Sequence, residues 1–254
     1  MKNQFRFTFR KYLFLLISIQ ISGLLSAQVQ NNKSLNAIEE LLQYSQDYYG
    51  IDDELINGCV YHMHDYRIKG NPYLFEDAWS NGTMYIKGKE YPNLLLKYDV
   101  LNNEIVLNTQ INEYKRLLSI NKSQIDSFLI ESRLFVNSRI ITNITKEQTF
   151  YEKINNNEYC LLVKYKKVFL KTYNNLSPNG RFSSLKKDFI LLHNGVLKNA
   201  NTSNLLIKGF ENIDKKKVKI YMKQNGINYS NASSRELKEL MTYCNTITSA
   251  KNEN

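Results

Sequence analysis

The hydrophobic residues recur with different periods along the chain. Over residues 34–50 they return every three or four positions, between Ser34 in a capping position and Gly50 just past the end. This spacing predicts an amphipathic helix of about four turns. Its apolar face begins with Leu35, Ile38, Leu41 and Leu42.

Between residues 82 and 197 the pattern becomes strand-like. Short runs rich in Val, Ile, Leu, Tyr and Phe are separated by turn residues, which predicts antiparallel strands joined as a meander. The turns at 87–88, 102–103 and 155–157 contain Gly or Asn, which tolerate the positive φ of tight hairpins. The expected strands cover 83–86, 94–100, 104–107, 114–120, 125–130, 149–154, 159–164, 168–173 and 189–193.

Helical spacing returns in roughly the last fifty residues. Thr202 is placed to cap a short helix around 203–210, and Asp214 to cap a second one that stops at Gly226. Ser233 and Glu236 form a capping box before Leu237, which predicts a third helix.

These patterns together predict an α+β protein. Its centre is an antiparallel β-meander, either a sandwich or a partly closed barrel, with an N-terminal helix and a C-terminal helical segment. We expect one domain over 28–254, because no linker or internal repeat divides it. Within it, 28–81 holds the helix and the approach to the sheet, 82–197 is β-rich and 198–254 is helical.

Residues 1–27 have the pattern of a secretory signal peptide. Lys2, Arg6, Arg10 and Lys11 precede an apolar stretch over 12–25, and Ser26 and Ala27 end it. The stretch is shorter than the roughly 20 apolar residues of a membrane-spanning helix. We therefore expect export to the periplasm, the cell surface or the medium, with no transmembrane span after cleavage.

Composition and charge narrow the functional classes. With 10 Gly and 3 Pro the chain is neither low-complexity nor collagen-like. The 34 Lys and Arg against 24 Asp and Glu give a formal charge of +10. That charge fits an anionic envelope component or a protein partner, or simply a solvated basic face. Nucleic acid is disfavoured because the chain is expected to be exported.

Three cysteines cannot all pair. Cys244 follows Leu237, Leu240 and Met241 at helical spacing, so we expect a buried apolar role for it. If any pair bridges, Cys59 with Cys160 is the expected one.

Residues with metal-binding or catalytic side chains form no specific motif. His62 and His64 would share one face of a strand, but Cys59 and Asp65 would have the opposite parity, so no metal site is predicted. No Gly-x-Ser-x-Gly turn is present. We predict no catalytic residue and no cofactor. A hydrolase would require Asp53, Glu76 or His64 to converge in a cleft.

Two groups of side chains are candidates for binding. Tyr73, Phe75 and Trp79 form an aromatic platform for a sugar or another ligand, or else pack into the core. The other group is a basic hairpin, which either contacts an anion or guards a sheet edge against pairing. Its lysines are Lys164, Lys166, Lys167 and Lys171, joined by Lys186 and Lys187.

A spaced series of aromatic and glycine positions follows the signal-like segment. The series comprises residues 70–73, Trp79, Gly82, 96–99, 150–151 and 161–164. In this order it resembles a group of uncharacterised exported proteins of Bacteroidetes-type bacteria. The resemblance implies an exported location and the architecture above, and it transfers no functional residue.

The sequence does not decide whether the chain is an enzyme, and we expect a non-catalytic binding or interaction protein of the cell envelope. The alternative is a periplasmic carrier that holds an apolar or acylated ligand inside a curved sheet. A carrier needs an apolar cavity of several hundred Å³ there, whereas an interaction module fills that space with side chains. An envelope hydrolase is the third hypothesis.

Overall fold

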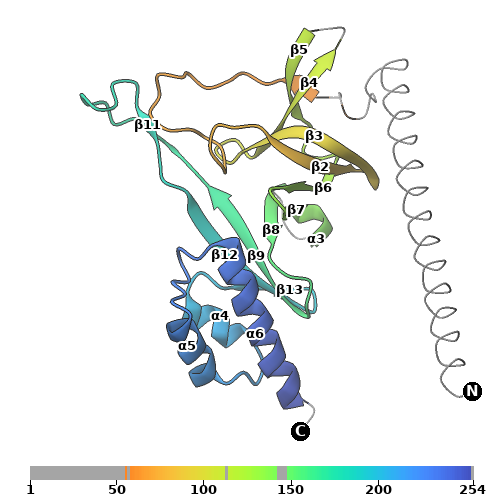
Figure 1. Cartoon of the computed structure of the whole chain (residues 1–254), viewed down its shortest axis with the longest axis vertical. Helices are drawn as coiled ribbons and strands as arrows, with labels where there is room; N and C mark the ends of the chain where they lie inside the picture. The colour runs from red at the N-terminus through yellow and green to blue at the C-terminus, as the bar shows by residue number, and fades with distance from the viewer. Residues whose placement is uncertain (1–54, 56–57, 112–113, 142–147, 253–254) are drawn as a thin grey trace, which may run out of the picture. The chain divides into compact units, whose positions relative to one another are not determined.

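A computed structural model describes residues 55, 58–111, 114–141 and 148–252 (Figure 1). The predicted signal peptide and the predicted helix over 34–50 lie outside these residues. Those that are described belong to one unit, which spans Asp53–Asn254.

Eleven strands form one antiparallel sheet, which is not closed. Its strands, in order across the sheet, are β1 (Gly58–Val60), β5 (Tyr114–Ile120), β4 (Glu104–Ile111), β3 (Lys89–Asp99), β2 (Ser80–Ile86), β6 (Ile125–Ile130), β7 (Arg133–Asn137), β8 (Phe150–Lys153), β9 (Tyr159–Lys166), β12 (Lys186–His193) and β13 (Val196–Asn199). β10 (Phe169–Leu170) and β11 (Arg181–Phe182) pair separately.

The predicted meander is confirmed within β2–β5 and within β6–β9, where consecutive strands are neighbours. The groups β2–β5 and β6–β9 do not form one continuous meander, because β6 pairs with β2 and not with β5. Gly82 permits this pairing. A Cβ at that position would lie only 2.5 Å from the Leu129 carbonyl oxygen.

The sheet curls around a cluster of aromatic rings. Tyr98 on β3 and Phe150 on β8 are four strand positions apart, a separation of about 19 Å in a flat sheet. Their ring centroids are nevertheless 6.1 Å apart. Phe128 and Phe135 fill the space between them, stacked at 4.8 Å, and all four residues are at most 2% exposed. Side chains therefore fill the concave side.

The turn predictions are confirmed, but some strands were missed. Lys87, Gly88 and Asn103 have positive φ, and 155–157 connects β8 to β9. β1, β7, β11 and β13 were not predicted. The prediction of a strand over 168–173 is wrong outside 169–170, because the chain leaves the main sheet there and pairs only with β11.

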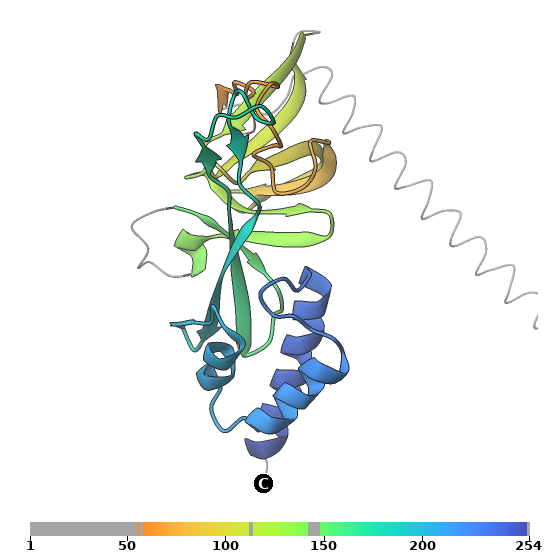
Figure 2. The same cartoon turned by 90° about the vertical axis from the view of Figure 1, so that its left-hand side faces the viewer.

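Four helices are described. α3 (Ser138–Ile141) follows β7, while α4 (Ser203–Gly209), α5 (Lys215–Gln224) and α6 (Ser234–Asn252) lie near one end of β9 and β12 (Figures 1 and 2). The predicted caps are confirmed: Thr202 caps α4 and Asp214 caps α5. None of the helices in the part of the chain that the structure describes is long and apolar enough to cross a membrane.

All three cysteines are described, and all are free thiols. No disulfide forms, so the condition for pairing Cys59 with Cys160 is not met; β1 and β9 are separated by seven other strands in the sheet. Cys244 is fully buried, as predicted, and burial raises the pKa of its thiol to about 12.

Candidate functional site

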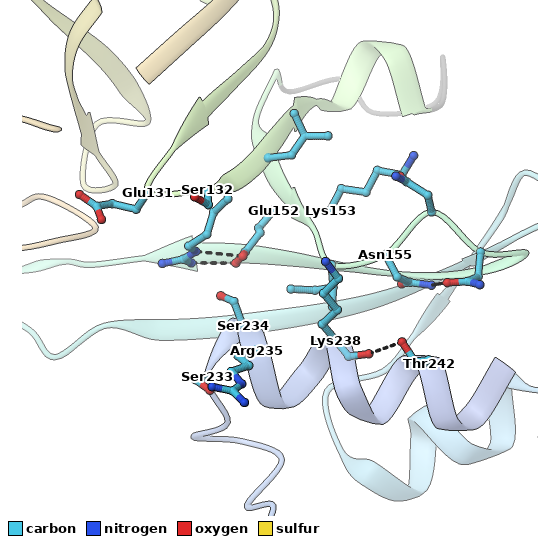
Figure 3. A pocket seen from close by; sticks show the side chains of 15 residues that line it. Glu131, Ser132, Glu152, Lys153, Asn155, Ser233, Ser234, Arg235, Lys238 and Thr242 are labelled. Carbon is cyan, nitrogen blue, oxygen red and sulfur yellow. Dashed lines mark hydrogen bonds and ion pairs between the residues drawn. The ribbon is translucent and has the colours of Figure 1, made fainter. Parts of the chain in front are cut away.

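One pocket lies where two neighbouring strands of the sheet diverge. β7 and β8 pair only from Phe135 with Glu152 to Asn137 with Phe150. Beyond Phe135 and Glu152 the ladder stops, and a groove of about 660 Å³ opens between the two strands and α6 (Figure 3). We call it the α6 groove. It is lined by residues 131–134, 152–157 and 233–235 together with Lys238 and Thr242.

One wall of the α6 groove contains a buried ion pair. The Nε and Nη2 groups of Arg133 donate to Glu152 at 2.9 and 2.7 Å (Figure 3). The Tyr165 hydroxyl donates to the same carboxylate at 2.6 Å. The Glu152 side chain is 3% exposed and that of Arg133 is 20% exposed. The rings of Phe75, Phe135 and Tyr165 lie 5.0 to 5.5 Å from the guanidinium carbon.

These contacts fix Arg133 without using all of its donors. A guanidinium has five N–H groups, and Glu152 accepts two of them. Burial would lower the pKa of Arg133, but the hydrogen bonds and the charge of Glu152 outweigh it and raise the pKa. Burial and the negative charge of Glu152 raise the pKa of Tyr165. Arg133 therefore stays charged, and the two bonds to Glu152 do not account for all of its N–H groups.

The two long walls each contribute a lysine. Lys153 comes from the end of β8 and Lys238 from α6, and neither forms an ion pair within the described ranges. Ser234, Lys238 and Thr242 are spaced by four residues, so they follow one face of α6 over about 12 Å. The groove is thus elongated and has more cations than acids.

Hydrogen bonds within the chain hold the end of the α6 groove at Asn155 and the N-terminus of α6. The Asn155 amide donates to the Tyr159 carbonyl at 2.7 Å and accepts from the Leu161 N–H at 3.0 Å. At the start of α6 the predicted capping box is confirmed. The Ser233 N–H donates to Glu236 at 2.7 Å, and hydrogen bonds from Ser233 lower the pKa of Glu236. The helix terminus is therefore already capped and offers no free anion site.

The predicted aromatic platform is occupied by the chain's own cations. The Lys97 ammonium lies 4.7 Å from the Tyr73 ring and 4.6 Å from the Trp79 ring, and it pairs with Asp77. Phe75 covers Arg133. Tyr73 is 5% exposed. The structure does not bring the three rings together as one open surface, and the sugar-binding role stays a prediction.

The basic hairpin is also divided. Lys166 pairs with Asp188. Lys167 turns inward and donates to the carbonyl oxygens of Asn71 and Tyr73 at 2.9 and 2.6 Å, and burial lowers its pKa. Lys164 is partly exposed and Lys171 is exposed. The proposed anionic contact through these four lysines stays a prediction.

A second polar cluster surrounds Asp99, which is fully buried. Its carboxylate accepts from the Tyr61 hydroxyl at 2.9 Å, lies 3.2 Å from His64 Nε2 and accepts the Leu101 and Asn102 N–H groups. These bonds tie the segment before β2 to the β3–β4 turn. Glu76, one of the residues that a hydrolase would need, is exposed, and Asp53 lies outside the described residues.

The remaining metal-capable side chains stay apart. Asp65 forms an ion pair with Arg67, whose hydrogen bonds lower the pKa of that carboxyl to about 2. His193 stacks on Tyr159 and lies 2.9 Å from Glu158. Among the residues that the structure places, no three His, Cys, Asp or Glu side chains gather as metal ligands.

Sequence reasoning did not single out Arg133, Glu152, Lys153 or Lys238. Arg133 meets Glu152 only through the register of β7 on β8, and β7 was not predicted. Lys238 did carry a signal. The capping box and the buried positions Leu237 and Met241 place it on an exposed face of α6.

The fold and the groove define an α+β protein with an open antiparallel sheet and a polar groove beside its C-terminal helix. No protein family, curated protein or solved structure matches the chain.

Proposed function

We propose that the chain is an exported, non-catalytic binding protein that holds an anionic ligand in the α6 groove. The observation that supports this most is that two lysines, Lys153 and Lys238, line the same groove as Arg133. Neither lysine is neutralised within the part of the chain that the structure covers. Export rests on the pattern of residues 1–27.

The charge balance of the groove supports an anion. Its four cations are Arg133, Lys153, Arg235 and Lys238, and its two acids are Glu131 and Glu152. Arg133 pairs with Glu152, Arg235 pairs with Glu239, and Ser80 donates to Glu131. Lys153 and Lys238 are the groove's cations without an ion pair among the described residues. A ligand that approaches the groove therefore meets a surplus of positive charge, which attracts anions and speeds their association.

The carrier alternative has less support. The curl of the sheet agrees with a partly closed barrel, but the rings of Tyr98, Phe128, Phe135 and Phe150 occupy the place where an acyl chain would lie. In the α6 groove only Leu134 and Ile154 are apolar. An apolar ligand would leave the charged and amide groups there without partners, which is unfavourable.

A hydrolase has less support as well. His64 and Asp99 are close, but His64 does not line the α6 groove or the groove beside β1 and β5. Of the other residues named for this role, Glu76 is exposed. A His–carboxylate pair that anchors a turn explains the same contacts without chemistry.

The test measures binding of three anionic probes to the full-length chain by titration calorimetry: hexaglutamate, hexagalacturonate and pyrophosphate. The groove variant carries Lys153→Gln and Lys238→Gln. The control carries Lys208→Gln and Lys216→Gln, which remove the same charge from exposed positions on α4 and α5. We expect at least one probe to bind the wild type and the control alike and to bind the groove variant about tenfold more weakly. No binding of any probe, or equal binding by both variants, would refute the proposal.

A further inference from the structure

The shape of the α6 groove narrows the class of anion. Its helical wall extends for about 12 Å from Ser234 to Thr242. An extended polypeptide advances about 3.3 Å per residue, so this length accommodates three or four residues. A single phosphate or carboxylate would contact only a small part of such a groove.

The lining favours a peptide over an anionic glycan. None of its 15 residues is aromatic, so the groove offers no ring face on which the apolar face of a sugar could stack. Asn155, Asn157, Ser233 and Ser234 are already hydrogen-bonded within the chain. The groove still offers the side-chain amide of Asn156 and the hydroxyl of Ser132. Amides and hydroxyls both donate and accept hydrogen bonds, as the groups of a peptide backbone require.

Three cations that line the α6 groove, Arg133, Lys153 and Lys238, are suited to bind several carboxylates of one ligand. Arg133 is partly buried, and its planar guanidinium is held by Glu152 and by three aromatic rings. A guanidinium in this state can receive one carboxylate or carbonyl in a fixed geometry. Lys238 follows one turn of α6 after Ser234, and Lys153 lies on the strand side. Both are flexible point charges that adapt to side chains of different lengths.

We propose, on the basis of the proposed function, that the anionic ligand is an extended acidic segment of a partner polypeptide. Three or four of its residues lie along α6. One of its acidic or carbonyl groups accepts from Arg133, and neighbouring Asp or Glu side chains pair with Lys153 and Lys238. The Asn156 amide and the Ser132 hydroxyl hydrogen-bond its backbone.

Fluorescence anisotropy with labelled hexaglutamate tests this partner class on the full-length chain, with hexaglutamine as the uncharged peptide of equal length and hexagalacturonate as the anionic glycan. We expect hexaglutamate to bind at least tenfold more tightly than either. Lys153→Gln/Lys238→Gln should weaken it about tenfold, and Lys208→Gln/Lys216→Gln less than twofold. Higher salt should weaken it further.

The other outcomes separate the two proposals. Groove-dependent binding of hexagalacturonate without binding of hexaglutamate would overturn the peptide assignment and leave the anion groove standing. Binding of hexaglutamate that is equal in the groove and control variants would overturn the assignment as well, since the contact would then lie elsewhere. If no anionic probe binds, both proposals fall.

Discussion

The buried pair of Arg133 and Glu152 gives a sharp prediction about stability. Glu152→Gln keeps the size of the side chain but removes the charge that neutralises Arg133, whose side chain is only 20% exposed. Removing one partner of a buried ion pair costs about 3–5 kcal/mol. The amide of Gln can still accept one hydrogen bond from Arg133, so we expect the lower end of this range.

Urea unfolding followed by the fluorescence of Trp79, the only tryptophan, measures this loss. With an m-value of about 2 kcal/mol/M, a loss of about 3 kcal/mol lowers the midpoint by about 1.5 M. Asp188→Asn is the control, because it breaks the exposed pair with Lys166 and should cost at most about 1 kcal/mol. Replacing the pair together, as Arg133→Met with Glu152→Leu, should restore most of the loss.

If Glu152→Gln changed the midpoint no more than Asp188→Asn does, the pair would not be desolvated in solution. The account of Arg133 as a fixed, charged group in the α6 groove would then be refuted.

Three other properties follow from the structure. A thiol reagent should modify Cys59 in the native protein and the two buried cysteines only in denaturant; two or three reactive thiols under native conditions would contradict their burial. Gly82→Ala should lower the free energy of unfolding by about 2 kcal/mol, because the added methyl group meets a carbonyl oxygen of β6, and an unchanged urea midpoint would show that the strands adapt. Ser233→Ala should destabilise the protein more at pH 7 than at pH 3. The folded pKa of Glu236 is lowered, so the stability that this carboxylate contributes is present above its unfolded pKa of about 4.3 and is lost as the pH falls through the folded pKa. Equal losses of stability at both pH values would refute the role of the capping box.

Helix starts and two hairpins could be predicted from the sequence, because short local motifs determine them. Thr202, Asp214 and the capping box set the starts of α4, α5 and α6, because an N-cap side chain bonds backbone groups only two or three residues away. Turns with Gly or Asn likewise located the β2–β3 and β3–β4 hairpins.

The missed hairpins differ in their cause. Glu131 and Ser132 both have positive φ in the tight turn between β6 and β7. Such turns usually contain Asn-Gly, which this turn lacks, so the local sequence did not predict β7. Asn194-Gly195 is that usual sequence, and it could have located β13. Pairing between β2 and β6 depends on contacts between residues about forty to fifty positions apart, which no local pattern encodes.

The candidate site was harder to predict than the fold. Several side chains chosen from the sequence have partners within the chain: Trp79 faces the Lys97 ammonium, and Lys167 donates to the Tyr73 carbonyl. Composition locates such residues but not their partners. The α6 groove exists because β7 and β8 stop pairing at Phe135 and Glu152, which is a property of strand register and not of any motif.

Mapping of amide chemical shifts on isotope-labelled protein titrated with hexaglutamate tests the central claim most directly. The account predicts shifts concentrated at residues 152–157 and 233–242, with little change at β1 or β4. Shifts centred on another surface, or no shifts at saturating peptide, would contradict it.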